Sequence, residues 1–169
     1  TGGTARPSKG CAAAAGGGNG ARGVLRNADF HRFQDTLLLN GRVYATNCLV
    51  QGDVDFIWGY GSAFFDHCEI KALHQGYHVM ARTPAGQPGF VFADCLLTAA
   101  DDVKQNWLAR IEADRFPHSH VAFIRCQMGE HIPVAGWLVT GTNVSQLRFE
   151  EFQTADALGR PSDVRRRHP

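Results

Sequence analysis

Short runs that alternate apolar and polar residues recur along most of the chain. Six such runs can be aligned, at residues 24–30, 43–50, 63–70, 90–97, 121–128 and 147–154. They are rich in β-branched and aromatic residues and are bounded by Gly, Asn, Asp and Pro, which is typical of strands. No segment of the sequence shows a convincing i, i+3, i+4, i+7 stripe of an amphipathic helix. The pattern therefore predicts an all-β protein.

The runs share one position at a nearly regular interval. That position holds Ala28, Cys48, Cys68, Cys95, Cys126 and Phe152, in steps of 20, 20, 27, 31 and 26 residues. A strand-rich unit repeated in this way indicates a solenoid. We expect a right-handed parallel β-helix of about six coils, in which equivalent positions stack about 4.8 Å apart as inward ladders. The cysteines are then expected to be buried thiols, although their closeness leaves a disulfide open.

The two ends of the chain differ from the repeats. Residues 1–23 are rich in Gly and Ala and are expected to be poorly ordered or to form a degenerate first coil. Residues 24–155 are predicted to form the β-helix and residues 156–169 a basic tail, in which the arginines 165–167 are expected to be solvated. The sequence has no start Met and no signal-peptide pattern, so we expect a fragment or a processed product.

Composition narrows the class of protein only a little. The 169 residues are 44% hydrophobic and carry a net charge of +1, which fits one domain with its own core. The small net charge gives no reason to expect a nucleic-acid partner. No apolar run approaches the roughly eighteen residues of a membrane span. We expect a monomer without nucleic-acid or membrane partners.

Two aspartates with apolar neighbours are the first candidates for chemistry. Asp35 and Asp55 are 20 residues apart, which is the local length of one coil, so they should stack on one face of the solenoid. Two carboxylates that close cannot both ionise freely, so their pKa values should split, as suits a nucleophile and an acid. Asp also occurs often in turns, so corner residues without a catalytic role are the other interpretation.

Several segments carry a family resemblance. QDTL at 34–37 and GDVDFIWG at 52–59 resemble the QDTL and DFIFG motifs of the pectin methylesterases, or pectinesterases. GRVYATNCLVQG at 41–52 and the segment 107–137 are similar to further motifs of that family. The resemblance runs from about residue 21 to the C-terminus. It implies a right-handed parallel β-helix, in agreement with the repeat.

The resemblance also implies roles in the removal of methyl esters from galacturonosyl units. Asp55 would be the nucleophile, and Asp35 the general acid and then the general base. Gln34 would stabilise the oxyanion with its amide N–H. Arg110 would pair with Asp55, orient it and keep it ionised. Asp53 lies on the same side as Asp55 in a regular strand, so the motif, not the periodicity, selects Asp55.

Three aromatic residues are candidate substrate contacts by the same resemblance. Trp137 matches a tryptophan that contacts the sugar, and Phe56 and Trp58 follow Asp55 in its motif. Core packing is the alternative for either tryptophan. The resemblance implies no cofactor and no metal, pectin (homogalacturonan) as the partner, and an extracellular or cell-envelope location. His74 and His78 are four residues apart in an expected loop, which does not indicate a zinc site.

The chain departs from the family in ways that open alternatives. The family's second oxyanion glutamine would fall within residues 11–15, which read CAAAA, and no Gln precedes Gln34. The LGRPW motif appears as LARIE, with Glu112 at the tryptophan position. LGRP does occur at 158–161, but after the AGW turn, so Arg160 is interpreted as non-catalytic. A weakened family member that binds polyuronides, or an esterase or thioesterase with another substrate, are therefore alternatives.

Overall fold

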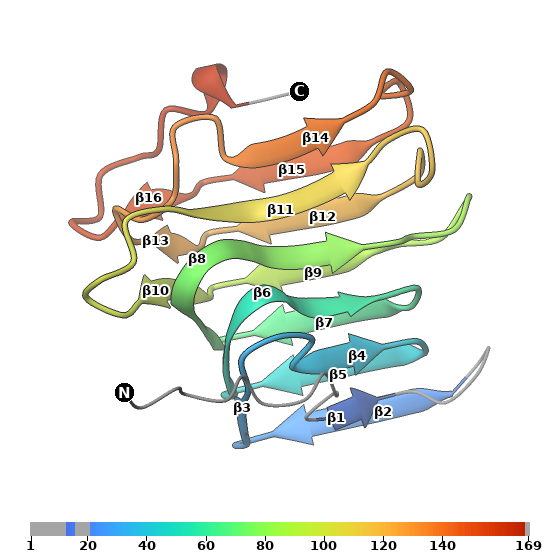
Figure 1. Ribbon diagram of the computed structural model, residues 1–169. Coiled ribbons are helices and arrows are strands. Elements are labelled where there is room, and N and C mark those ends of the chain that lie inside the picture. The colour runs from blue at the N-terminus through green and yellow to red at the C-terminus, as the bar shows by residue number, and fades with distance from the viewer. Residues whose placement is uncertain (1–12, 16–20, 168–169) are drawn as a thin grey trace, which may run out of the picture.

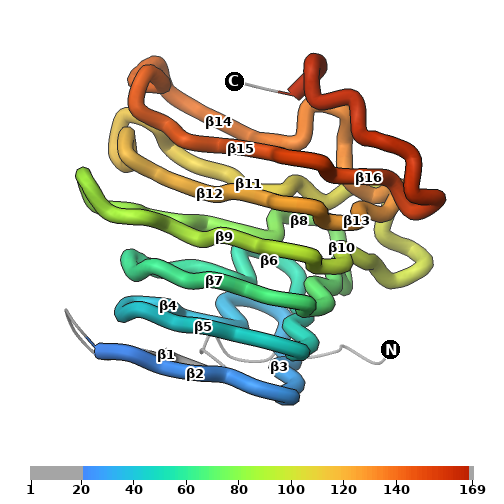
Figure 2. The backbone as a smooth tube through the Cα atoms, turned by 180° about the vertical axis from the view of Figure 1, so that it is seen from behind, coloured from blue at the N-terminus to red at the C-terminus, as the bar shows by residue number. Residues whose placement is uncertain are grey.

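The chain winds into a flattened solenoid. The computed structural model describes residues 13–15 and 21–167. In Figure 1 the front strands run to the right and the rear strands to the left as the chain climbs from blue to red. Figure 2 shows the rear strands from behind. This path is right-handed, as the sequence predicted.

Two parallel sheets form the walls. Sheet A contains β1 (Ala13–Ala15), β3 (Asp29–His31), β4 (Leu37–Leu39), β6 (Leu49–Gly59), β8 (Glu69–Ala81), β10 (Leu96–Ala99), β11 (Asn106–Glu112), β13 (Gln127–Met128), β14 (Trp137–Thr140) and β16 (Ala155–Asp156). Sheet B contains β2 (Arg22–Arg26), β5 (Arg42–Thr46), β7 (Ser62–Asp66), β9 (Phe90–Ala93), β12 (His120–Ile124) and β15 (Arg148–Phe152). Each coil gives one strand to sheet B, so its six strands confirm the prediction of a parallel β-helix of about six coils.

Helices contribute almost nothing to the described part of the chain. The one helical element there is η1, a single 3-10 turn at Val164–Arg166. No helix among residues 13–15 and 21–167 has the length and apolar character needed to cross a bilayer.

The cysteine ladder forms as predicted, except in its last coil. Cys48, Cys68, Cys95 and Cys126 are all buried. Ile124 pairs with Phe152, however, so Cys126, two residues further on, is level with Thr154. Thr154 is 4% exposed and Phe152 is 60% exposed. The prediction of Phe152 as the ladder residue was wrong because the final step is two residues longer than the sequence alignment assumed.

A corner residue with an unusual backbone precedes each ladder position. Asn27, Asn47, His67, Asp94, Arg125 and Gln153 all have φ between 49° and 53°. This left-handed conformation is uncommon outside glycine, and Asn, Asp and His adopt it most readily. The repeated corner turns the chain from sheet B to sheet A and supports Thr154 as the last ladder residue.

Stacked aromatic rings fill the interior between the sheets. Phe65 lies 4.6 Å from Phe92, which lies 4.7 Å from Phe123, with nearly parallel rings. Trp137 from sheet A continues the column 5.8 Å beyond Phe123, and Phe149 follows at 5.0 Å. Offset ring pairs of this kind add to the stabilisation that burial provides.

Thiol chemistry offers a direct check on this interior. Cys48, Cys68, Cys95 and Cys126 are free and buried. We expect a thiol reagent to leave all four unmodified in the native protein and to label all four after denaturation. Peptide mapping by mass spectrometry measures this site by site. Fast labelling of any of the four under native conditions, or a disulfide between two of them, would contradict this packing.

The C-terminal tail differs from the prediction that its arginines are all solvated. Arg167 is not solvated: its Nε lies 2.7 Å from Glu151 Oε1, and the two side chains are 13% and 2% exposed. Arg167 also donates to the carbonyl of Pro133 at 2.8 Å, so the tail is fixed to the last coil by charge and hydrogen bonds. At the other end, β1 pairs in parallel with β4. The rest of segment 1–23 up to Gly20 lies outside the described residues.

Candidate active site

The two aspartates occupy equivalent places in adjacent coils. Leu37 pairs with Ile57, and Gln34 forms a parallel bridge to Val54, so Asp35 is level with Asp55. Both residues have a left-handed backbone, with φ of 53° at Asp35 and 48° at Asp55. The register of β6 shifts on either side of Val54, as at a β-bulge. Bulges of this kind commonly re-aim side chains next to active sites.

Asp55 is held by Arg110 from two coils further along the solenoid. Arg110 Nε donates to both carboxylate oxygens at 3.0 Å, and Nη2 donates to Oδ2 at 2.5 Å. The Asp55 side chain is 6% exposed and that of Arg110 is 38% exposed. A forked guanidinium–carboxylate contact fixes orientation as well as charge. The structure thus brings together the pair that the sequence proposed.

Burial and charge act in opposite directions on Asp55. Burial raises the pKa of the Asp55 carboxyl above its usual value, and the hydrogen bonds and charge of Arg110 oppose that rise, with a smaller contribution from Arg82. The pKa of Arg110 is raised, chiefly by its hydrogen bonds to Asp55. Arg110 therefore favours the ionised carboxylate that a nucleophile needs, but it does not outweigh desolvation.

Asp53, two residues earlier, has a different environment. Its Oδ1 is buried and has no hydrogen-bond partner in the described part of the chain. Burial raises the pKa of Asp53, and the charge of His74 opposes that rise. Only Asp55 of these two has a guanidinium partner, which agrees with the choice that the motif made.

The remaining polar candidates lie between β3 and β4, one coil before Asp55. Gln34 is exposed at its bridge to Val54, and Asp35 is half-buried. The segment expected to carry a second oxyanion donor, residues 11–15, is described only at Ala13–Ala15, where it forms β1.

The expected aromatic contacts do not all face outward. Phe56 is fully buried and packs against His78, with ring centroids 5.4 Å apart. Trp137 is 3% exposed, because it completes the interior ring column. Both rings are buried in this structure, and for Trp137 core packing was the alternative interpretation. Trp58 is half-buried and faces Arg82, whose guanidinium carbon lies 5.1 Å from its ring centroid.

Two residues next to Asp55 and Arg110 were not predicted from the sequence. Tyr77 lies beneath Arg110, with the guanidinium carbon 4.9 Å from its ring centroid. Arg82 lies close enough to influence Asp55. Tyr77 is one coil beyond Asp55, in line with the bulge at Val54. Coil register could have indicated Tyr77, but no local motif marks Arg82.

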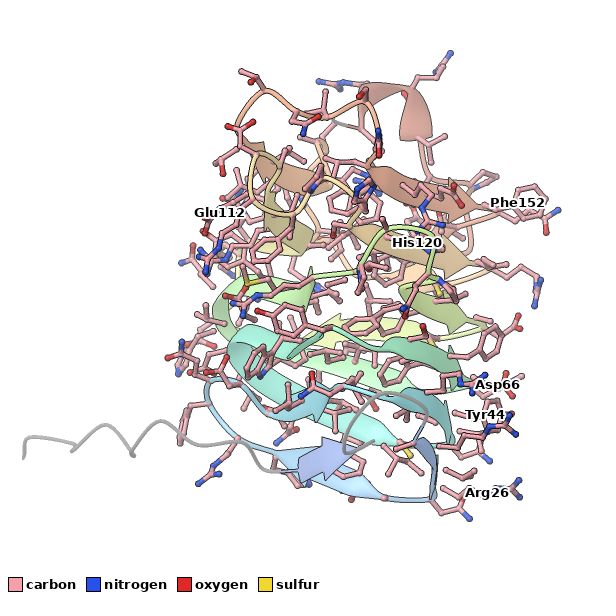
Figure 3. All side chains as sticks on the ribbon, turned by 90° about the vertical axis from the view of Figure 1, so that its right-hand side faces the viewer. Arg26, Tyr44, Asp66, Glu112, His120 and Phe152 are labelled. Atoms are coloured by element: carbon pink, nitrogen blue, oxygen red, sulfur yellow. The ribbon has the colours of Figure 1, made fainter. Side chains whose placement is uncertain are left out.

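A possible cation cluster lies away from this site. Ligand atoms of Asp66, His67 and Asp94 lie within 4.8 Å of one another. Asp94 is already paired with Arg125 at 2.6 Å, and Asp66 accepts from Tyr44 at 2.7 Å. Figure 3 shows Asp66 and Tyr44 on the side opposite Glu112, which ends β11. Partners within the protein thus account for the arrangement of these carboxylates.

His74 and His78 were expected in a loop, but both lie in strand β8. His78 Nδ1 bonds the carbonyl of Trp107 at 2.9 Å and its ring is fully buried. His74 is exposed. The two histidines therefore have different environments, and packing accounts for the first.

A parallel β-helix with a guanidinium-bound aspartate beside a second, level aspartate defines a candidate carboxylate-based enzyme. A model of the family described as Pectinesterase matches residues 2–167, and the chain belongs to this family. It is 32% identical to Pectinesterase 31 of Arabidopsis thaliana over 69% of this chain and 37% of that protein. It is 30% identical to Probable pectinesterase A of Aspergillus fumigatus over 79% and 45%. The chain thus spans between about a third and a half of these relatives.

Solved structures support the same fold. The pectin methylesterase of Erwinia chrysanthemi superposes with a TM-score of 0.70 at 22% identity, covering 88% of this chain and 53% of that one. A pectin methylesterase in complex with a hexasaccharide gives a TM-score of 0.69, covering 86% and 52%. At this identity the likeness concerns the fold.

Proposed function

We propose that this chain is the catalytic part of an enzyme that removes methyl esters from galacturonosyl units of pectin, releasing methanol and pectate. The observation that carries the proposal is the forked contact between Arg110 and the buried Asp55, one coil from Asp35. Family membership supplies the substrate class.

The arrangement supports a two-step reaction. A carboxylate oxygen of Asp55 attacks the ester carbonyl carbon, and the negative charge moves to the carbonyl oxygen. Collapse of this intermediate breaks the bond to the methoxy oxygen, which takes a proton from Asp35 and leaves as methanol. Asp35 then removes a proton from water, which attacks the acyl-enzyme and releases the sugar carboxylate. Gln34 would donate to the oxyanion in both steps.

Partner and location follow from the same proposal. The pectin methylesterase solved with a hexasaccharide is a relative in fold, and we extend an acidic polysaccharide partner to this chain. The ligand would lie across the outer face of sheet A, where the Arg110 side chain is 38% exposed. A location outside the cell or in its envelope would give access to such a polymer.

Methanol release from highly methylated pectin tests the function. We expect steady release, with an equal number of new carboxylates measured by titration, and no release from fully demethylated pectate. Enzyme denatured by heat gives the background. Release no faster than this background would contradict the proposal.

A second function has a specific sequence observation behind it. Residues 11–15 contain no glutamine where a second oxyanion donor was expected. Loss of one such donor typically lowers a rate about a hundred- to a thousandfold. A chain that binds pectin without turnover would show affinity in a binding assay and no methanol in the first one.

A further inference from the structure

The outer face of sheet B carries a basic and aromatic surface on its first three strands. In β2, β5 and β7 every second side chain points away from the core, as the alternating burial along these strands shows. The strands pair in register, so their outward residues align in three rows along the solenoid axis. One row holds Arg22, Arg42 and Ser62, the middle row Val24, Tyr44 and Phe64, and the third row Arg26, Thr46 and Asp66. We call these nine residues the sheet B patch.

The middle row of the patch is apolar and open to solvent. Val24 is 60% exposed and Phe64 is 41% exposed. Tyr44 lies between them, and its ring is nearly parallel to that of Phe64, with the centroids 6.1 Å apart. Val91 pairs with Phe64 and extends the row into β9. Apolar side chains aligned across four strands form a contiguous surface of the kind that marks a binding site.

Arginines border this row on both sides. Arg22, Arg26 and Arg42 are exposed, and no carboxylate in the described part of the chain lies within 4.0 Å of their side-chain nitrogens. Exposed arginines elsewhere do have such partners, namely Arg125, Arg160 and Arg165. The three arginines of the patch therefore keep their charge and their donors for an external anion.

Asp66 is the single acidic residue of the patch and already has partners. It accepts a hydrogen bond from Tyr44 Oη at 2.7 Å, and its other oxygen lies 2.7 Å from His67 Nδ1. The bond to Asp66 raises the pKa of Tyr44, and the charge of Arg26 acts in the opposite direction, so Arg26 lies near this ring. Figure 3 shows Arg26, Tyr44 and Asp66 one above another on the side opposite Glu112. The patch thus presents an excess of positive charge beside an aromatic ring that is held in place.

This combination of groups suits an acidic polysaccharide. The C–H faces of sugar rings can pack on the apolar row. Guanidinium groups on either side can donate paired hydrogen bonds to sugar carboxylates, whereas a methyl ester offers no charge and weaker acceptors. Single-stranded nucleic acid also binds to arginines and rings, but the net charge of +1 provides no wider positive field to attract it. Charge and apolar surface together therefore favour a polyuronide.

We propose that the sheet B patch is a second, non-catalytic binding surface for polyuronide. It would hold the enzyme on de-esterified stretches of the polymer while sheet A acts on methylated units. This inference rests on the proposed function for the choice of polymer. Sheets A and B are opposite walls of the solenoid, so loss of the patch should weaken binding of the polymer and leave the chemistry at Asp55 unchanged.

Binding to immobilised pectate tests the patch directly. In an Asp55→Asn background, surface plasmon resonance compares pectate with a neutral glucan and with single-stranded DNA. We expect the double variant Arg22→Gln/Arg42→Gln to bind pectate about tenfold more weakly and with a smaller dependence on salt. Arg166→Gln is the matched control and should change neither, because Arg166 is exposed, has no carboxylate within 4.0 Å in the described chain, and lies in η1 at the other end of the solenoid.

Turnover separates this proposal from the proposed function. In active enzyme the double variant should raise KM for partly demethylated pectin about threefold or more with kcat unchanged. Both constants for a fully methylated hexasaccharide should stay the same, because that ligand has no carboxylates for the arginines. Phe64→Ser tests the apolar row without a change of charge and should weaken pectate binding about threefold. Melting temperatures of all variants exclude misfolding.

Several outcomes would overturn the second surface. They are no pectate binding by the parent, equal pectate binding by the parent and the double variant, an equal loss in Arg166→Gln, and DNA bound as tightly as pectate. If methanol is never released but pectate binding depends on Arg22 and Arg42, only the esterase function fails. If methanol is released and the double variant binds pectate as the parent does, only the second surface fails.

Discussion

Replacing Asp55 with asparagine is expected to lower methanol release from pectin about a thousandfold or more, because the amide cannot act as the nucleophile. Arg110→Ala should lower it by about a hundredfold or more, since Asp55 then loses both orientation and the charge that favours its ionised form. Arg110→Lys keeps the charge but loses the fork, and should be intermediate. Initial rates at saturating pectin measure all three.

The pH profile separates a role in ionisation from a structural one. Arg110 lowers the pKa of Asp55 against the effect of burial, so its removal raises that pKa further. The ionised fraction is then lost at a higher pH, and the acid limb of kcat/KM should move upward in Arg110→Ala. Arg110→Ala also leaves a buried acid unpaired, so its melting temperature must be followed.

Arg160 provides the matched control for these variants. It belongs to the LGRP sequence and pairs with Asp156 at 2.7 Å, with a side chain that is 72% exposed. Arg160→Ala should leave the rate and the pH profile unchanged. A similar loss in both arginine variants, or an Asp55→Asn protein with near-normal rate, would remove Asp55 and Arg110 from the reaction.

The stacking of the aspartates could be predicted because the chain repeats evenly at that point. The coils that contain Asp35 and Asp55 have the same length, so equal spacing in sequence became equal position in space. The left-handed backbone at both residues was not expected. Asp tolerates this conformation better than most residues, so the turn interpretation and the catalytic one apply to the same two side chains.

The sequence was least informative where contacts with distant coils determine the position of a side chain. Phe152 was misplaced because the last loop is longer than the local pattern shows. Trp137 was a candidate substrate contact with core packing as the alternative, and it lies next to Phe123 in a column built by strands of both sheets. No sequence motif marks Arg82, and its ring partners come from the coil before it, Trp58 and Tyr60, and from the loop after β11, Phe116. Short-range patterns carry little information about such contacts.

Acidification is expected to destabilise the fold through two buried histidines. His78 is fully buried and His131 is 6% exposed, and their ring centroids lie 5.5 Å apart. Burial, and then the charge of His131, lower the pKa of His78 from 6.5 to about 3. Burial lowers the pKa of His131 from 6.5 to about 4. Both rings therefore stay neutral in the fold at pH values where the unfolded chain is protonated.

Protonation of the two rings favours the unfolded chain. Below about pH 6.5 the unfolded state binds more protons than the folded state, so stability falls as pH falls and levels off only near the folded pKa values. Between about pH 7.5 and pH 4.5 the two rings together should lower the free energy of unfolding by about 3 to 5 kcal/mol. That is a large part of the stability of an ordinary domain.

Urea unfolding across this pH range measures the loss, and variants assign it. His78→Asn can keep the hydrogen bond to the carbonyl of Trp107, and with His131→Asn it removes both titrating rings. The double variant is expected to start less stable at neutral pH and to lose much less on acidification. His31→Gln changes an exposed ring and should keep the parent's slope. Equal slopes in the parent and the double variant would assign acid sensitivity to the carboxylates, because rings that gain their protons only on unfolding must alter the slope when they are removed.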